Sequence, residues 1–216
     1  MTVHAPIPDY AAARQAMVDS QLRPQGVNDP AVIAAMSQVS REQFIPEESR
    51  LLAYIDRSVP LGEGRAIPAP AVLGLLLTAL APLRGERALV VGAATGYSAA
   101  VMAAMGLKTT AVESSAGLAS AARKNGVEIA EGPLEDGHSK NAPYALILID
   151  GAVEVIPDAL IDQLEEGGRV GAAIIDKGIT RLVTGHKAGG GFGYLTIADA
   201  AVPSLPGFQR PRAFTF

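Results

Sequence analysis

The chain has 216 residues, a formal net charge of −4 and no cysteine. Apolar residues make up 49% of it, which is enough for one sizeable packed domain and argues against disorder. The mixed charges argue against a protein that binds a nucleic-acid backbone, because such proteins need a basic face. The absence of cysteine excludes disulfides, thiolate nucleophiles and zinc–sulfur sites. The sequence shows neither a secretory signal nor an apolar run that could span a bilayer, so we expect a soluble cytoplasmic protein without a membrane partner.

The first 58 residues are expected to form a helical cap. Apolar residues recur at helical spacing from Asp9 to Arg23. Asp29 followed by Pro30 is typical of a helix start, and this second helix is predicted to continue to Val39.

Residues 59–176 alternate between strand and helix patterns. A loop is predicted at Leu61–Arg65, followed by a buried helix from Pro70 to Ala81. Short apolar runs predict strands at residues 88–91, 109–112, 127–130, 144–149 and 169–175, and helical patterns occupy 97–105, 116–124 and 157–164. This alternation predicts a doubly wound α/β fold with a mostly parallel sheet and helices on both faces.

In about the last 40 residues, the alternation of strand and helix patterns gives way to the pattern of an antiparallel hairpin. Ile179–His186 and Phe192–Ile197 flank a run of glycines and are predicted to form an antiparallel hairpin, with a last edge strand at Ala213–Phe216. We therefore expect residues 1–216 to form a single domain, made of a cap (1–58), an α/β core (59–176) and a carboxyl-terminal hairpin with its edge strand (177–216).

A candidate ligand site lies at the end of the first core strand. Ligands of open α/β sheets bind beyond the carboxyl ends of the strands. Here the strand runs into a tight turn bracketed by Gly92 and Gly96. Glu113 ends the next strand, about 20 residues further on, where an acid can accept hydrogen bonds from ribose hydroxyls. The alternative is an ordinary turn, with Glu113 capping the following helix.

The turn favours S-adenosylmethionine over a dinucleotide. A dinucleotide fingerprint needs further glycines where Ala94 and Tyr97 stand, and a bulky Tyr97 disfavours a pyrophosphate at the helix start. S-adenosylmethionine carries no phosphate and does not need that packing. A nucleotide-dependent oxidoreductase remains an alternative.

Blocks along nearly the whole chain resemble the protein-L-isoaspartate O-methyltransferase family. In chain order they are Met17–Leu22, Val39–Pro46, Ala53–Asp56, Leu61–Gly64, Gly92–Tyr97, Pro143–Tyr144, Ile156–Pro157, Leu160, Gln163–Leu164 and Glu166–Arg169. The order of these blocks is more specific than any single one. The resemblance implies a Rossmann-like class I S-adenosylmethionine-dependent methyltransferase, whose substrate is an isoaspartyl or other carboxylate of a protein or peptide, and which starts the repair of aged proteins.

The resemblance also implies the chemistry. A side-chain carboxylate, ionised at neutral pH because its pKa is about 4, displaces the methyl group in line and needs no general base. This agrees with the scattered histidines His4, His138 and His186, which suggest neither a triad nor a metal site.

From the turn and the acids at the strand ends, the cofactor S-adenosylmethionine is expected to contact the turn, the acid after the second strand and the acid that ends the fourth. These residues are Gly92, Ala94, Thr95, Gly96, Tyr97, Glu113 and Asp150. Asp150 is predicted to face the cofactor or the substrate cleft, the alternative being a turn aspartate that bonds to its own backbone.

The active-site loop of the family corresponds to Gly64–Pro70, which places Arg65, Ile67 and Pro68 at its catalytic positions. The family usually reads Gly-Gln-Thr-Ile-Ser-Gln-Pro there, so Arg65 stands in place of glutamine. Its guanidinium could hold a substrate carboxylate through two parallel hydrogen bonds. Alternatively, Arg65 is a solvated loop residue or pairs with Glu63.

Other family positions also differ. The acid usually found in the first strand is Val90, and the usual Gly-Asp-Gly after the third strand is Gly132-Pro133-Leu134. A methyltransferase-fold protein that serves as a binding or scaffold module without catalysis is therefore the competing hypothesis.

Overall fold

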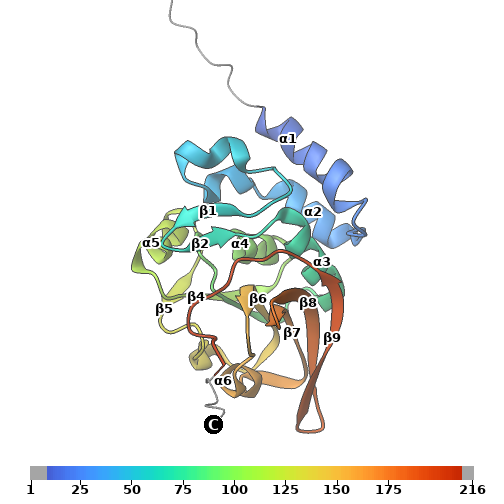
Figure 1. Ribbon diagram of the computed structural model, residues 1–216, viewed down its shortest axis with the longest axis vertical. Coiled ribbons are helices and arrows are strands. Elements are labelled where there is room, and N and C mark those ends of the chain that lie inside the picture. Colours follow the sequence, from blue (N-terminus) through green and yellow to red (C-terminus); the bar gives the residue numbers. More distant parts are fainter. Residues whose placement is uncertain (1–8, 211–216) are drawn as a thin grey trace, which may run out of the picture.

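The computed structural model describes residues 9–210, which form a seven-stranded sheet under an amino-terminal cap (Figure 1). The cap contains α1 (Tyr10–Met17), which runs on into a π-helical turn at Val18–Leu22, and α2 (Pro30–Gln38). Asp29 caps α2 by accepting hydrogen bonds from the first amides of the helix, as its sequence predicts. Two 3₁₀ turns, Arg41–Phe44 and Glu47–Leu52, complete the cap.

The strands of the main sheet are ordered β5-β4-β3-β6-β7-β8-β9. Their bounds are Arg87–Val91 (β3), Lys108–Glu113 (β4), Ile129–Glu131 (β5), Tyr144–Val153 (β6), Leu164–Asp176 (β7), Ile179–Ala188 (β8) and Gly191–Asp199 (β9). Pairing is parallel from β5 to β7 and antiparallel in the two last pairs, which confirms the predicted fold class. Val91 pairs with Val112 and Ile149, so the carboxyl ends of β3, β4 and β6 meet at one edge.

Helices cover both faces of this sheet. The buried residues of α3 (Pro70–Leu80), α4 (Tyr97–Ala104) and α5 (Ala116–Lys124) form one hydrophobic cluster with the cap. The other cluster contains residues of α6 (Asp158–Asp162) and of the segment after β9, including Leu205 and Phe208. The carboxyl-terminal segment is therefore part of the core, although its sequence reads as a loop.

The predicted loop at residues 61–65 is instead part of a small antiparallel hairpin. Its strands are β1 (Val59–Gly62) and β2 (Arg65–Ile67), which form a sheet of their own beside the main one. The chain reverses direction at Gly62, Glu63 and Gly64, which have left-handed φ angles of 87°, 52° and 70°. Strands this short carry no alternation that sequence reading could detect.

Several bounds also differ from those predicted. β6 continues to Val153 instead of ending before Asp150, and its register against β7 shifts between Leu148 and Ala152. β7 begins at Leu164, because its first residues pair with the start of β6, and α6 is correspondingly shorter. The predicted edge strand at 213–216 lies outside the described residues. Within residues 9–210, no helix has the length and apolar character needed to cross a membrane.

Candidate cofactor site

The turn after β3 has the backbone conformation of a close-approach loop. Gly92, Ala94 and Gly96 all have positive φ, at 75°, 50° and 98°. Only glycine adopts this region freely, and an L-residue such as Ala94 costs about 1–2 kcal/mol there. The Ala94 amide donates a 2.8 Å hydrogen bond to Oε2 of Glu113, which holds the turn in place.

Two predicted cofactor residues of this turn point toward the cap instead. The Thr95 hydroxyl donates to the carbonyl of Phe44 at 2.6 Å. The Tyr97 ring meets the ring of Phe44 edge-on, with centroids 5.6 Å apart, and the Arg41 guanidinium lies 4.7 Å from its centre. Burial raises the pKa of the Tyr97 hydroxyl. Thr95 and Tyr97 therefore fasten the turn to the cap.

Sequence reasoning did not identify Arg41, which is the largest fully buried side chain among the described residues. Its Nε donates to the carbonyl of Ala53 at 2.8 Å and its Nη2 to the carbonyl of Pro68 at 2.6 Å. These bonds anchor the end of the hairpin to the cap. Burial lowers the pKa of Arg41, while Tyr97 and Asp150 act in the opposite direction. A lone arginine in a polar stretch gave no sequence signal for this role.

Glu113 is fully buried at the end of β4, and its carboxylate is surrounded by donors. Besides the Ala94 amide on Oε2, the amides of Ser114 and Ser115 donate to Oε1 at 2.8 and 3.1 Å. The N-cap of α5 is Ser115, whose hydroxyl accepts from the Leu118 amide. The helix-capping alternative for Glu113 is therefore wrong, since another residue holds that position.

Arg65 is buried beside Glu113. Its Nη1 lies 2.5 Å from Oε1 of Glu113, and its Nη2 donates to the carbonyl of Gly92 at 2.9 Å. The alternative of a solvated loop arginine is wrong, because only 6% of Arg65 is exposed. The alternative of a pair with Glu63 is also wrong, because Glu63 accepts from the Ser115 hydroxyl instead. The carboxylate that Arg65 holds in this conformation belongs to the chain itself.

Leu205 fills the space above the glycines of the site. A Cβ atom on Gly92 would lie 2.9 Å from a methyl carbon of Leu205, and one on Gly151 would lie 2.5 Å from its Cγ. The segment that carries Leu205 is fixed to the end of β6, since the Leu205 amide donates to the carbonyl of Ala152 at 2.8 Å. The Ala152 amide in turn donates to the carbonyl of Pro203 at 2.8 Å.

Asp150 lies beside the turn, within β6. Its carboxylate accepts a short hydrogen bond from the hydroxyl of Ser98 in the first turn of α4, rather than bonding to its own backbone. Burial raises the pKa of Asp150, and Ser98, Arg65 and Arg41 partly oppose that effect. Asp150 thus reaches the same edge of the sheet as Gly92 and Glu113.

The hairpin residues Ile67 and Pro68 are placed differently from Arg65. Ile67 is a buried core residue that pairs with Val59 across the hairpin. The carbonyl of Pro68 accepts a hydrogen bond from Arg41.

Residues 9–210 hold no grouping of three or more histidine, cysteine or acidic side chains suited to a metal.

A family model described as protein-L-isoaspartate(D-aspartate) O-methyltransferase matches residues 12–199. The chain belongs to this family. Among curated members, the protein-L-isoaspartate O-methyltransferase of Methylorubrum populi is 41% identical over 165 residues, covering 74% of this chain and 78% of the relative. Protein-L-isoaspartate O-methyltransferase 1 of Rhodopseudomonas palustris is 38% identical over 192 residues, with coverage of 83% and 78%.

Solved structures support the isoaspartate methyltransferase fold. One protein-L-isoaspartate O-methyltransferase matches with a TM-score of 0.81 at 24% identity, covering 90% of this chain and 66% of its own. A Plasmodium falciparum protein, described as a putative protein-L-isoaspartate O-methyltransferase in complex with S-adenosyl-L-homocysteine, matches with a TM-score of 0.78 at 22% identity and coverage of 92% and 99%. At these identities the likeness establishes the fold.

For an isoaspartate methyltransferase, the expected cofactor contacts and the observed ones conflict at two side chains. The glycine turn and Glu113 form the kind of cradle that a nucleoside needs. Arg65 and Leu205 fill that cradle, so in this conformation the residues present do not fit the cofactor.

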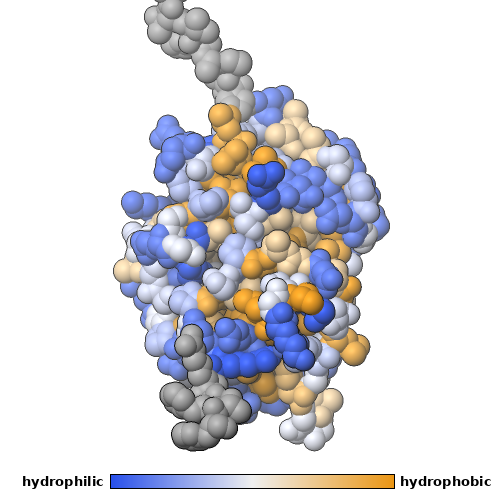
Figure 2. Space-filling model, viewed as in Figure 1, coloured by the Kyte–Doolittle hydropathy of each residue, from blue (hydrophilic) through white to orange (hydrophobic). Residues whose placement is uncertain are grey.

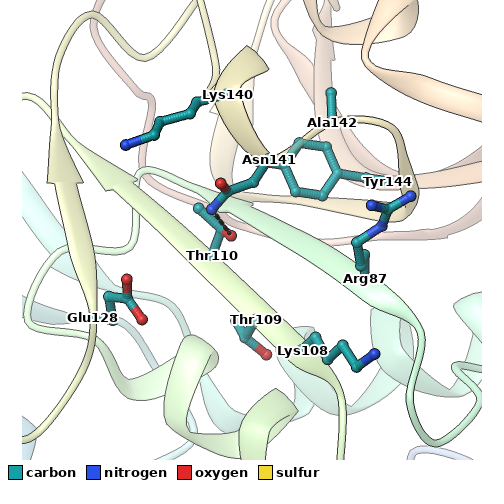
Figure 3. A pocket seen from close by; sticks show the side chains of 9 residues that line it. All are labelled: Arg87, Lys108, Thr109, Thr110, Glu128, Lys140, Asn141, Ala142 and Tyr144. Carbon is teal, nitrogen blue, oxygen red and sulfur yellow. Dashed lines mark hydrogen bonds between the residues drawn. The ribbon is translucent and has the colours of Figure 1, made fainter.

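The surface of the molecule also has a cleft away from this cradle. A polar cleft of about 470 Å³ lies at the opposite, amino ends of the strands, lined by Arg87, Lys108 and Lys140 among others (Figure 3).

Proposed function

We propose that this chain is an S-adenosylmethionine-dependent carboxyl O-methyltransferase that acts on isoaspartyl residues of proteins or peptides. The observation that carries the proposal is the meeting of Glu113 with the left-handed turn at Gly92–Gly96, through the 2.8 Å bond from the Ala94 amide. The names of the relatives support the same activity and do not favour a binding module without catalysis.

The proposed chemistry asks little of the protein beyond positioning. A substrate carboxylate is already ionised at neutral pH, so no general base has to remove a proton from it. A fold that orients the two reacting groups is therefore enough, and the turn that would contact the cofactor is fastened to the cap through Thr95 and Tyr97. The absence of a nucleic-acid partner is also a proposal, and it rests on the mixed charges of the chain. A cytoplasmic location is likewise a proposal.

The test is methyl transfer to a synthetic isoaspartyl peptide. Purified protein, S-adenosylmethionine with a labelled methyl group and the peptide should give a base-labile methyl ester. The same peptide with a normal aspartyl linkage should remain unlabelled. Absence of ester formation with the isoaspartyl peptide, under conditions in which the protein is folded, would overturn the proposal.

A matched pair of variants adds specificity. Glu113→Gln should abolish most of the activity, because the carboxylate at the cradle is removed. Glu131→Gln is the control, since Glu131 ends the neighbouring strand in register with Glu113 but sits on the surface. Equal activities of the two variants would remove Glu113 from the site.

A further inference from the structure

The guanidinium of Arg65 makes the contacts expected of a bound ligand. It bonds to the carboxylate of Glu113 and to the carbonyl of Gly92, the two groups that frame the predicted ribose position. The pair is almost completely withdrawn from water, with side-chain exposures of 4% and 0%. A buried carboxylate needs such a partner, because an unpaired buried charge is strongly destabilising.

Leu205 completes the occupation of the site. The glycines Gly92 and Gly151 leave open space next to the backbone, and the Leu205 side chain lies in that space with only 5% exposure. The polar part of the cradle is therefore filled by Arg65 and its apolar part by Leu205, two residues far apart in the sequence.

We propose that this chain occupies its own cofactor site with Arg65 and Leu205, and that S-adenosyl ligands bind only by displacing both. The proposal rests on the proposed function, because it concerns the same site. It goes beyond that function by assigning these two side chains the role of internal competitors.

The elements that carry the two residues lie outside the ladders of the main sheet, so their displacement does not require that sheet to break. The hairpin β1–β2 shares no ladder with the seven-stranded sheet, and its tip is held by the exposed contact between Glu63 and Ser115 as well as by Arg65 (Figure 1). Arg41 fixes the far end of the hairpin through Pro68. The segment around Leu205 joins the end of β6 through the isolated bridge Ala152–Ser204, its neighbouring amide bonds and the bond from the Glu154 amide to the carbonyl of the buried Phe208.

The low exposures of Arg65 (6%), Glu113 (0%) and Leu205 (5%) show that the site is closed in this conformation. On the face drawn in Figure 2, the region where the segment after β9 crosses below the hairpin is covered by mixed apolar and polar atoms. A ligand can therefore bind only to an open state, in which Arg65 and Leu205 have left the site. If the open state holds about 0.1–10% of the molecules, the apparent affinity is lowered by about 10- to 1000-fold.

The first experiment measures S-adenosylhomocysteine binding by calorimetry. Arg65→Gln removes the charge while keeping a polar side chain, and it should bind S-adenosylhomocysteine at least about 10-fold more tightly than the unmodified chain. The control is Arg123→Gln, which removes a guanidinium from the exposed pair with Glu131 and should leave the affinity unchanged. Unchanged or weaker binding by folded Arg65→Gln overturns the role of Arg65.

The second experiment follows Leu205 directly and does not depend on the folding of an Arg65 variant. Because the chain has no cysteine, Leu205→Cys introduces a single thiol whose reaction with a chromogenic disulfide reports its exposure. S-adenosylhomocysteine should accelerate that reaction several-fold. Leu195→Cys is the control, because Leu195 is already 74% exposed and the thiol introduced there should react rapidly with or without ligand. If S-adenosylhomocysteine slows the reaction of the Leu205→Cys variant, or leaves its rate unchanged, the role of Leu205 is overturned.

The outcomes separate this inference from the proposed function. If the unmodified chain forms methyl esters and binds S-adenosylhomocysteine as tightly as Arg65→Gln, the function stands and the internal competition is wrong. If neither the unmodified chain nor any variant binds S-adenosylhomocysteine or forms an ester, both are wrong, because removing the competitor has not revealed a site.

Discussion

The buried pair between Arg65 and Glu113 leads to a quantitative stability prediction. Removing one partner leaves the other charge buried and uncompensated, which typically costs about 3–5 kcal/mol. Glu113→Gln should reach the upper part of this range. The side-chain NH₂ of the introduced glutamine would face the N–H groups of Arg65, Ala94 and Ser114, which now donate to the carboxylate. For a chain of this size, the corresponding fall in Tm is about 6–20 °C, at about 2–4 °C per kcal/mol.

Arg65→Gln should cost less than Glu113→Gln, because the Glu113 carboxylate keeps its three backbone amide donors. The double variant leaves no unpaired charge. Its loss of stability should therefore be smaller than the sum of the single losses by about 0.5–3 kcal/mol, the range measured for coupled neighbours.

The assay is urea unfolding of the four proteins of this double-mutant cycle. The control is a second cycle, Arg123→Gln with Glu131→Gln, on a pair whose side chains are 48% and 42% exposed. That pair should contribute less than about 1 kcal/mol. If Glu113→Gln also costs less than about 1 kcal/mol, or if its effect simply adds to that of Arg65→Gln, the reasoning from burial is refuted.

Three further predictions concern the same edge of the sheet. Ala94→Gly should raise the free energy of unfolding by up to about 1 kcal/mol, since the relief of a left-handed alanine exceeds the added chain entropy, and a loss of stability in thermal unfolding would contradict this. In the Arg65→Gln background, Glu113→Ala should weaken S-adenosylhomocysteine binding by about 1–3 kcal/mol in calorimetry, whereas unchanged affinity would exclude Glu113 as a ligand contact. Burial raises the pKa of Asp150 above its ordinary 3.8, so the carboxyl group binds its proton more tightly in the native state than in the unfolded state. The free energy of unfolding therefore falls as the pH rises from below 3.8 through the raised pKa. Asp150→Asn should therefore raise the Tm at pH 7, with a gain that disappears below pH 3.8, and an equal gain at both pH values would refute this reading.

The sheet could be predicted because buried parallel strands leave a clear pattern. The apolar runs of β3 and β6 are flanked by helices with their own periodicity, and both strands appear where the sequence places them. The ends of the strands could not be predicted equally well. The lengths of β6 and β7 depend on how far each neighbour extends, which is a property of the pair and not of either segment.

Half of the site could likewise be predicted. Gly92 and Glu113 end adjacent parallel strands, so the strand order alone brings them to one edge. The family resemblance predicts Arg65 in the site, as the holder of a substrate carboxylate, but its actual partner Glu113, 48 residues away, could not be found from the sequence. Leu205 is not predicted in the site at all, since it belongs to a proline-containing segment. Contacts of this kind depend on tertiary packing, for which local sequence carries no signal.

The position of Arg65 links stability and ligand binding in a way that a purely structural ion pair would not. Arg65 occupies Oε1 of Glu113, and this oxygen cannot serve the guanidinium and a ribose hydroxyl equally well. When a ligand enters, Glu113 must therefore exchange the guanidinium for the ribose hydroxyl. Arg65→Gln should accordingly lower the free energy of unfolding while raising the affinity for S-adenosylhomocysteine. A pair that only supported the fold would lower both, since a disordered cradle binds its ligand poorly. Opposite signs in one variant would therefore identify Arg65 as a competitor for the site and not merely as part of its frame.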